Sequence, residues 1–361
     1  MTSGKSRHPH SAWKLVKEII SLVLMSLSIF SCTRSGDTIY IDDDEELKND
    51  TRPIVFFVFN EGSMGDMSYV DAMYRGVAKA ANKDSLLLSL AEVPAEESKV
   101  DFAVNYFFNY MKSVDTNRRA LIIMANNNYE HLITNYSKKL AEAPNVSLLL
   151  AESSDTSLPV YTISLPTYGA CYMAGRLADE ALTDVSRVLV ASANRQNTDI
   201  ADMREGFARG LADGSRGVTA DYVYMADGDH GFDSADSAYH MSYDIDKTCQ
   251  MVLPLCGGTI QGFLRYNREH PQSFYTVGID DDMQIYSQRV PFSIVKHIDT
   301  VVEEWITRWR NGEKQELHQK FGLESGMTEI VLADKFKNSL SAPLDKLRKA
   351  AMEKEKEHEE R

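Results

Sequence analysis

The sequence has few cysteines and none of the short motifs in which cysteine and histidine usually bind metals. Its 361 residues include four cysteines and contain no CxxC pair, no HExxH motif and no Cys/His cluster. An extended segment would hold Cys249 and Cys256 roughly 23 Å apart, far beyond disulfide distance. We therefore predict buried or half-buried free thiols at Cys171, Cys249 and Cys256, and we expect no structural metal and no cofactor.

Recognisable catalytic motifs are also missing. The chain has no GxSxG nucleophile elbow and no HxE motif paired with the CxxC of a zinc deaminase. Ser63, in the sequence GSMG, has no base that the sequence alone assigns to it. His230 follows Asp229 in a predicted loop and is the one histidine placed near a candidate site, where a solvated loop side chain is the simpler interpretation. The sequence therefore does not predict an enzyme.

Basic charge is scarce. Lysine and arginine total 39 against 53 aspartates and glutamates, which gives a formal net charge of -14. No basic stripe with interleaved aromatic residues is present. Nucleic acid is therefore not expected as a partner.

The N-terminal apolar run, Ile19 to Phe30, is too short to span a membrane comfortably, because a span needs about 20 apolar residues. Four basic residues between Lys5 and Lys17 precede it, and Ser31 and Cys32 follow, as in a secretory signal. The sequence IFSC resembles a bacterial lipobox, in which the cysteine becomes the lipidated first residue. We predict a signal peptide at 1–31 and a lipidated tether at 32–51. The alternative is an uncleaved signal anchor with an incidental cysteine.

The full sequence has the composition of a globular protein, with 43% hydrophobic and 25% charged residues, and its length predicts two domains. Beyond the tether the chain has a regular pattern. Short apolar runs alternate with helical patterns, which predicts parallel sheets covered by helices on both faces. Strands are expected at 54–59, 85–90, 120–124, 146–150, 160–164, 187–191, 221–225, 251–255, 274–279, 293–296 and 329–333. Helices are expected at 66–82, 101–114, 129–142, 168–182, 201–212, 236–245, 259–269 and 299–310.

No Gly/Ser-rich or Pro-rich linker separates the two series, which favours a chain that crosses between the domains more than once. We predict two doubly wound α/β domains with a hinge of several crossovers. The assigned ranges are 52–160 with 291–312, 161–290 with 313–340, and a charged tail at 341–361. The tail is expected to be a solvent-exposed or frayed helix.

Candidate site residues follow the predicted strands, because ligands of open α/β sheets lie beyond the carboxyl ends of the strands. The first such loop runs from Asn60 into the helix that begins near Asp66, where Asp66 either faces a ligand or only caps the helix. Several amides, carboxylates and aromatic rings would suit a hydroxylated, ring-bearing small molecule. The candidates in these loops are Asn60, Glu61, Asp66, Tyr69, Asn126, Asn127, Asn128, Asn194, Phe232, Gly258 and Asp280.

Four segments carry a resemblance to a known family. The chain resembles the basic membrane protein family of type I periplasmic binding proteins, whose best-known members are purine nucleoside receptor lipoproteins of ABC transporters. The resemblance covers nearly all of the chain after the predicted signal peptide, and the order and spacing of the segments carry it more than any single one. The matching segments are GDMSYVDAMYRGV (65–77), YGACYMAGRLA (168–178), MREGFARGL (203–211), and VGIDDDMQ (277–284) with FSIVKHID (292–299).

The resemblance implies roles for several residues. Asp280 and Lys296 would hold the ribose hydroxyls, and the alternative is a plain salt bridge between the domains. Phe232 would stack on the base unless it is a core aromatic. Asn126 lies near a family aspartate that contacts the base.

The first loop departs from the family pattern. Val70 stands where the family has asparagine, and Met73 stands where a stacking phenylalanine is expected. If the helix places Tyr69 over the ligand, its ring would replace the missing one. The sequence therefore retains the family residues that would hold the sugar, and the resemblance leaves open which base the protein prefers.

Taken together, the sequence and the resemblance predict a lipid-anchored, monomeric substrate-binding protein of the cell envelope that faces the periplasm or the cell surface. Its expected ligand is a small solute, a purine nucleoside by resemblance, and its expected partner is an ABC permease. The alternatives are a ligand-sensing or scaffolding lipoprotein without a transporter and a nucleoside-processing enzyme.

Overall fold

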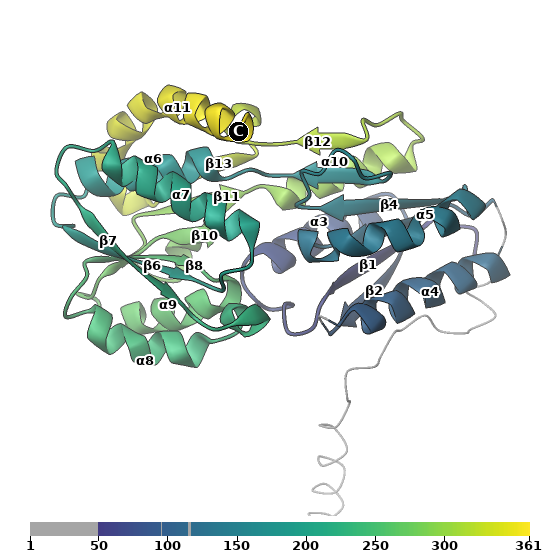
Figure 1. Cartoon of the computed structure of the whole chain (residues 1–361), viewed down its shortest axis with the longest axis horizontal. Coiled ribbons are helices and arrows are strands. Elements are labelled where there is room, and N and C mark those ends of the chain that lie inside the picture. The colour runs from purple at the N-terminus through teal and green to yellow at the C-terminus, as the bar shows by residue number, and fades with distance from the viewer. Residues whose placement is uncertain (1–49, 95, 115–116) are drawn as a thin grey trace, which may run out of the picture. The chain divides into compact units, whose positions relative to one another are not determined.

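The computed structural model of the protein describes residues 50–94, 96–114 and 117–361 (Figure 1). The predicted signal peptide, Cys32 and all but the last two residues of the predicted tether lie outside these residues. Of the helices in the described part of the chain, none is both long enough and apolar enough to cross a membrane.

One half of the molecule, formed mostly by the first part of the chain, is built on a parallel six-stranded sheet in the order β12-β5-β4-β3-β1-β2. We call it the first half. Its central strands are apolar throughout, so both faces need cover. Phe56 of β1 stacks on Phe107 of α4 at 4.5 Å between ring centroids, while its neighbour Phe57 joins the core under α3 and α10. Helices therefore cover both faces of this sheet. Its elements are β1 (Ile54–Asn60), α3 (Tyr69–Lys83), β2 (Leu87–Val93), α4 (Glu97–Ser113), β3 (Ala120–Met124), α5 (Ile133–Glu142), β4 (Val146–Ala151), β5 (Tyr161–Ser164), α10 (Ile298–Arg310) and β12 (His318–Lys320).

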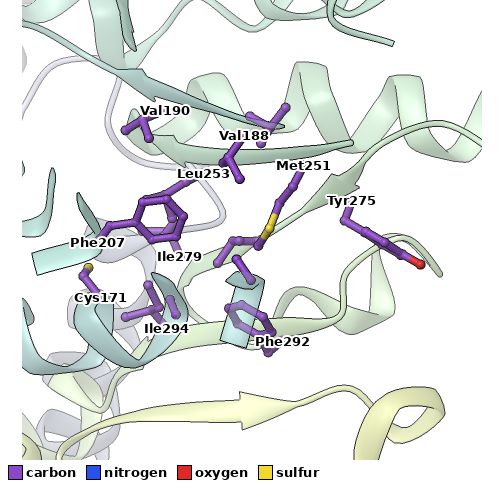
Figure 2. Close-up of a cluster of buried hydrophobic side chains, with 14 of the residues drawn as sticks. Cys171, Val188, Val190, Phe207, Met251, Leu253, Tyr275, Ile279, Phe292 and Ile294 are labelled. Carbon is purple, nitrogen blue, oxygen red and sulfur yellow. The ribbon is translucent and has the colours of Figure 1, made fainter. Parts of the chain in front are cut away.

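The second half builds a parallel four-stranded sheet, β7-β6-β8-β9, and a three-stranded sheet, β10-β11-β13. In the smaller sheet β10 is parallel to β11, and β13 is antiparallel to it. Figure 2 shows the core of this half, where Phe207 and Cys171 of two helices meet apolar side chains from both sheets. The elements are α6 (Tyr168–Glu180), β6 (Arg187–Ser192), α7 (Thr198–Ala212), β7 (Thr219–Tyr224), α8 (Ala235–Ile245), β8 (Met251–Leu255), α9 (Ile260–Glu269), β9 (Tyr275–Thr276), β10 (Gly278–Asp280), β11 (Phe292–Lys296) and β13 (Thr328–Leu332).

Short 3-10 helices shape several loops at the strand ends. Three of them contain or adjoin candidate site residues, since η1 follows β3, η2 follows β7 and η3 follows β8. Their bounds are η1 (Asn127–Leu132), η2 (Gly228–Phe232), η3 (Gly257–Thr259), η4 (Met283–Ile285), η5 (Leu323–Ser325) and η6 (Asp334–Phe336).

The described chain passes between its two halves three times. It leaves the six-stranded sheet after β5, returns from β11 into α10, and leaves again between β12 and β13. The predicted α/β fold with parallel sheets and several crossovers is confirmed.

The sheet membership of two strands differs from the predicted domain ranges. Residues 161–164, assigned to the second domain, pair with β4 in the six-stranded sheet. Residues 292–296, assigned to the first domain, pair with β10 and β13. Strand β12, with the polar sequence HQK, was not predicted because three edge residues carry no apolar pattern. The predicted strand at 274–279 is two short strands, β9 and β10.

The charged C-terminal segment is a helix that docks, α11 (Lys337–Glu359). Leu340, Leu347 and Ala351 recur at helical spacing, are buried, and join the core of the second half beside α6. The prediction of an exposed or frayed tail is therefore wrong for this face of the helix. The sequence did not predict this packing, because only three apolar positions carry the helical pattern and many charged residues surround them.

The three cysteines in the described residues are free and buried, as predicted. They are Cys171, Cys249 and Cys256, and burial raises the pKa of each thiol. Among the residues that the structure describes, no three His, Cys, Asp or Glu side chains form a group that could hold a metal ion.

Candidate ligand-binding site

A cavity of about 200 Å³ lies at the carboxyl ends of strands from both halves. Its walls come from the loops after β1, β3, β4, β7 and β8, from the last residues of β10 and β11, and from the first turns of α3 and α7. This is the location expected for a ligand between two α/β sheets. The lining residues are Asn60, Glu61, Gly62, Ser63, Asp66, Ser68, Tyr69, Val70, Asn126, Asn127, Asn128, Glu152, Asn197, Asp199, Ile200, Met203, Phe232, Asp233, Leu255, Cys256, Gly257, Gly258, Ile279, Asp280 and Lys296.

The charged centre of the cavity is the ion pair of Lys296 and Glu152. Lys296 ends β11, Glu152 follows β4, and their Nζ and Oε1 atoms are 3.2 Å apart. Both side chains are only 8% exposed. Burial raises the pKa of Glu152 and acts to lower that of Lys296, but the carboxylates of Glu152, Asp280 and Asp199 raise the pKa of Lys296 above its usual value. The lysine therefore stays cationic in a buried, acidic setting.

Two carboxylates of the cavity have left-handed backbone conformations that side chains other than glycine rarely adopt. The φ angles are +58° at Glu152 and +67° at Asp280. Each such residue costs on the order of 1–3 kcal/mol, and these positions cluster at ligand sites. The fold therefore holds both carboxylates beside Lys296 in spite of this cost.

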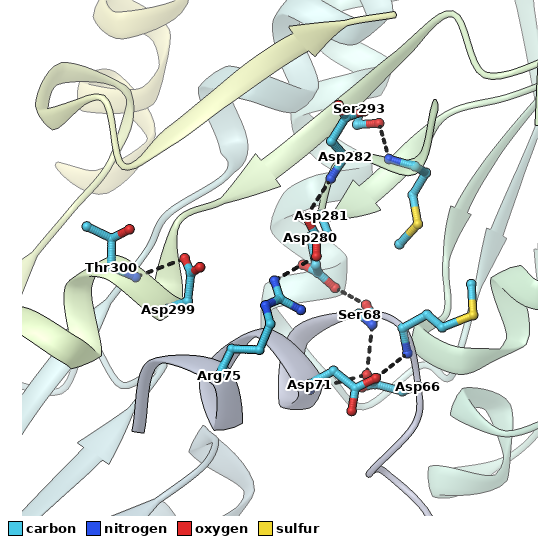
Figure 3. Close-up of polar contacts among 12 residues, drawn as sticks. Asp66, Ser68, Asp71, Arg75, Asp280, Asp281, Asp282, Ser293, Asp299 and Thr300 are labelled. Atoms are coloured by element: carbon cyan, nitrogen blue, oxygen red, sulfur yellow. Dashed lines mark hydrogen bonds and ion pairs between the residues drawn. The ribbon is translucent and has the colours of Figure 1, made fainter. Parts of the chain in front are cut away.

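Asp66 combines the two roles that the sequence left open. Its Oδ1 accepts the backbone N–H of Ser68 at 2.8 Å and its Oδ2 that of Val70 at 3.3 Å, so it caps the first turn of α3. It also lines the cavity, and burial, opposed by these hydrogen bonds, raises its pKa to about 7. Ser68 extends the chain of contacts, since its hydroxyl donates to Asp280 Oδ2 at 2.5 Å (Figure 3).

Contacts at the rim join the two halves around the cavity. Arg75 Nη2 lies 2.7 Å from Asp281 Oδ2, which leaves Asp281 outside the cavity in an exposed ion pair (Figure 3). Gln261 Nε2 donates to the carbonyl oxygen of Gly65 at 3.1 Å. Together with the Ser68 to Asp280 bond, these contacts describe a closed arrangement of the two halves.

Amides form one wall of the cavity. Asn60 accepts a hydrogen bond from the hydroxyl of Tyr129, and Asn126 Oδ1 accepts the backbone N–H of Asn128 at 3.0 Å. Asn127 Nδ2 donates to Asp199 Oδ2 at 3.0 Å. Burial, followed by the nearby charge of Glu152, raises the pKa of Asp199 to about 7. This wall therefore offers amide donors beside a carboxyl group that titrates near neutrality.

Two aromatic residues line the cavity. Phe232 packs closely on Gly257, where an added Cβ would lie 3.1 Å from the Phe232 ring. The hydroxyl of Tyr69 is buried and has no hydrogen-bond partner among the described residues, while Lys296 Nζ lies 5.4 Å from the centre of its ring. A buried hydroxyl without a partner is rare in folded proteins, and Tyr69 itself lines the cavity, so this hydroxyl is a candidate for contact with a ligand.

The structure brings together most of the residues that the sequence singled out. Nine of the candidate ligand-binding residues line the cavity, together with Glu61 and Asn128, while Met73 does not. Met73 is fully buried in the core under α3. The additional loop candidate Asn194 is also outside the cavity, where its side chain accepts the N–H groups of Gln196 and Asn197. His230 is exposed and does not line the cavity. The nine are Asn60, Asp66, Tyr69, Asn126, Asn127, Phe232, Gly258, Asp280 and Lys296.

Sequence reasoning missed Glu152 and Asp199. Glu152 directly follows β4, so the rule on strand ends could have found it, but it stands in a polar stretch with no matching motif and was not named. Asp199 lies in the first turn of α7, two residues before the predicted start of that helix at Ala201. Assigned helix ends commonly differ by one or two residues. The aliphatic side chains of Ile200 and Met203 on the same helix were also missed.

Comparisons with solved structures show the same fold at low sequence identity. An ABC transporter solute-binding protein from Aeropyrum pernix K1 matches with a TM-score of 0.63 and 16% identity, over 84% of this chain and 86% of that one. An ABC transporter periplasmic solute binding protein from Actinobacillus succinogenes 130z with bound D-allose matches with a TM-score of 0.61 and 12% identity, over 80% and 100%. A transcriptional activator of the comK gene from Bacillus halodurans matches with a TM-score of 0.61 and 13% identity, over 83% of this chain and 95% of that one.

A comparison with curated proteins gave no match. The family model described as Bmp, ABC transporter substrate-binding protein PnrA-like, matches residues 54–360, which is nearly all of the described chain. This agrees with the resemblance drawn from the four sequence segments. The chain therefore belongs to the Bmp family of PnrA-like ABC transporter substrate-binding proteins.

Proposed function

We propose that this substrate-binding protein is a lipid-anchored receptor that captures a nucleoside, by resemblance a purine nucleoside, and delivers it to an ABC permease. Cys32 is the proposed lipid attachment site, and the protein acts as a monomer in the cell envelope. Membership of a substrate-binding family supports a binding role over an enzymatic one.

The observation that carries the proposal is the placement of Asp280 and Lys296 at the ends of two adjacent strands. Asp280 ends β10 and Lys296 ends β11, and both line the cavity. A carboxylate accepts and an ammonium donates, so together they match two neighbouring hydroxyl groups of a ribose. Hydrogen bonds to charged groups are also the stronger ones in a buried site.

The remaining walls suit a flat ring. Phe232 offers an aromatic face, and Ile200 and Met203 offer aliphatic surface. Asn126 uses its Oδ1 within its own turn, so its Nδ2 is the group it presents to a ligand, and Nδ2 donates only. A base that presents an acceptor on this edge is therefore favoured.

The closed arrangement indicates how binding is signalled. Three crossovers connect the halves, and the rim contacts of Arg75 and Gln261 form only when the halves meet. A ligand held by both halves binds the closed form better than the open one and shifts the population toward it. The closed form is the one that a permease would recognise.

We expect nucleosides to raise the melting temperature of the purified protein, because a ligand that binds only the folded state stabilises it. Asp280→Ala should remove most of this rise, while Asp244→Ala, at a side chain that is 87% exposed, should keep it. The measurement is a thermal shift assay with purine nucleosides, pyrimidine nucleosides and hexoses, supported by native mass spectrometry of the protein as isolated. A response to hexoses and none to nucleosides would replace the nucleoside by a sugar.

Tyr69→Phe should change stability and affinity in opposite directions. Burial and the carboxylates of Glu152, Asp280 and Asp199 raise the pKa of Tyr69, so its hydroxyl remains a donor. Removing a buried hydroxyl without a partner should stabilise the ligand-free protein by about 1 kcal/mol, while the lost contact should weaken ligand binding about tenfold.

Urea denaturation and calorimetric titration measure the two effects. Tyr222→Phe, at an exposed ring, serves as the control and should change neither. If Tyr69→Phe leaves affinity unchanged, the hydroxyl does not contact the ligand.

The sensing alternative makes a different prediction about partners. A receptor of a transporter should stimulate the ATPase activity of its permease when loaded with ligand, whereas a sensor or scaffold without a transporter should not. Genes for a permease and an ATPase beside this one would favour transport, and product formation from nucleosides would favour an enzyme.

A further inference from the structure

The cavity has a strongly one-sided charge. Six acidic residues line it, and Lys296 is the one cationic residue among its described lining residues. A phosphate group would meet repulsion from most of this surface and has a single lysine to bind. The acidic lining residues are Glu61, Asp66, Glu152, Asp199, Asp233 and Asp280.

Of these carboxylates, Glu152 is the one that contacts the lysine ammonium. Its Oε1 atom accepts a hydrogen bond from Lys296 Nζ at 3.2 Å. Asp280 accepts from the Ser68 hydroxyl and Asp199 accepts from the Asn127 amide. Their charges act on Lys296 from farther away, so the direct counter-ion is Glu152.

Burying the Lys296–Glu152 ion pair costs free energy. Removing both charges from water costs several kcal/mol per ion, and only good geometry repays that cost. Glu152 also carries the left-handed backbone at φ +58°, in a position where glycine would be the unstrained residue. A buried, strained carboxylate that faces a ligand cavity points to a role in the choice of ligand.

We propose that Glu152 is a specificity-determining residue that neutralises Lys296, so that the cavity binds neutral hydroxylated solutes and rejects their phosphorylated forms. Paired with Glu152, the ammonium still has two further N–H donors for hydroxyl groups. Without Glu152 it becomes a point charge of the kind that binds phosphate. The identification of the neutral solute as a nucleoside rests on the proposed function, but the charge argument applies to any solute that contacts Lys296.

The test uses inorganic phosphate as the probe, so that it does not depend on the identity of the natural ligand. Glu152→Gln keeps the shape of the side chain and removes its charge. We expect phosphate to raise the melting temperature of this variant and to leave that of the wild-type protein unchanged, with chloride at equal ionic strength as the reference. Glu61→Gln removes the same charge from the exposed rim of the cavity without freeing Lys296, and it should show no response.

A second measurement compares each neutral ligand with its phosphorylated form, for both nucleosides and hexoses. The ratio of the two affinities should shift toward the phosphorylated form by about tenfold or more in Glu152→Gln, because a direct counter-charge is removed. A residue that only supports the fold would weaken both forms equally and leave the ratio unchanged.

Three outcomes overturn the proposal: no phosphate response in Glu152→Gln, an equal response in Glu61→Gln, or a wild-type protein that binds phosphate. If Glu152→Gln does not fold, Glu152→Gly removes the carboxylate and relieves the backbone strain, and the same expectations apply. A wild-type protein that binds no nucleoside would refute the proposed function while the phosphate response still decides the role of Glu152.

Discussion

Replacing Lys296 by methionine should abolish ligand binding and should also destabilise the ligand-free protein, most strongly at high pH. The ammonium is the one cation in the described lining of the cavity and the hydrogen-bond partner of Glu152. Methionine fills a similar volume but leaves the buried carboxylate of Glu152 unpaired. Breaking a buried ion pair by removing one partner costs about 3–5 kcal/mol.

The pH dependence of this loss has a defined sign. Burial already raises the pKa of Glu152, and Lys296 opposes that effect, so the variant should have a still higher pKa at Glu152. A group whose pKa is raised in the folded state binds its proton more tightly there than in the unfolded chain. Stability therefore falls as the pH rises between the unfolded and the folded pKa. The loss in Lys296→Met should be larger at pH 8 than at pH 5.

Urea denaturation at both pH values measures this difference, and a double variant provides the control. In Glu152→Gln/Lys296→Met both partners of the pair are absent, so part of the lost stability should return at pH 8 while ligand binding stays abolished. An equal loss of stability relative to the wild-type protein at pH 5 and at pH 8 would show that Glu152 is not buried in solution. A double variant that is no more stable than Lys296→Met would show that the two side chains do not interact.

The sequence predicted which residues follow the strands better than it predicted which residues of a helix point toward the cavity. Asn60, Asn126 and Asp280 were found because parallel strands end at a common edge, which requires only that the strands be recognised. Lys296 was found through the family resemblance. Met73 was placed in the site by its position in a family pattern. The rotation of α3 decides its direction, and α3 turns Met73 into the core and Tyr69 toward the cavity.

Long-range contacts explain the other differences. Strand β5 follows β4 in sequence and pairs with it, while β11 pairs with β13, which begins 36 residues later in the sequence. A sequence pattern shows that a segment is extended but does not show its neighbours. Lys296, the partner of Glu152, is likewise 144 residues away, so no local spacing in the sequence predicts this ion pair.

Replacing Glu355 by glutamine should remove a pH dependence that the C-terminal helix gives to the fold. The carboxylate of Glu355, on α11, is buried and accepts backbone N–H groups from Gly169 and Leu323, each at 3.0 Å. Gly169 lies just after the first crossover between the halves, and Leu323 lies within the third. One side chain therefore links two crossover segments to the end of the chain.

Burial, opposed by these two hydrogen bonds, raises the pKa of Glu355 to about 7. The folded state therefore holds a proton that the unfolded chain releases near pH 4.5, and stability falls as the pH rises from about 4.5 to 7. A rise of roughly 2.5 pKa units corresponds to about 3 kcal/mol. Glutamine cannot ionise, but its amide nitrogen cannot accept an N–H, so Glu355→Gln keeps only one of the two backbone hydrogen bonds at every pH. Measured against the wild-type protein, Glu355→Gln should therefore gain about 3 kcal/mol of stability between pH 5 and pH 8.

Denaturant unfolding at a series of pH values tests this expectation. Glu353→Gln, two residues away on the same helix at a side chain that is 65% exposed, is the matched control and should follow the wild-type curve. Since Asp66 and Asp199 also have pKa values raised to about 7, the wild-type protein retains part of its pH dependence in either variant. Parallel curves for Glu355→Gln and the wild-type protein would mean that Glu355 is solvated, and with it that α11 does not dock against the crossover segments.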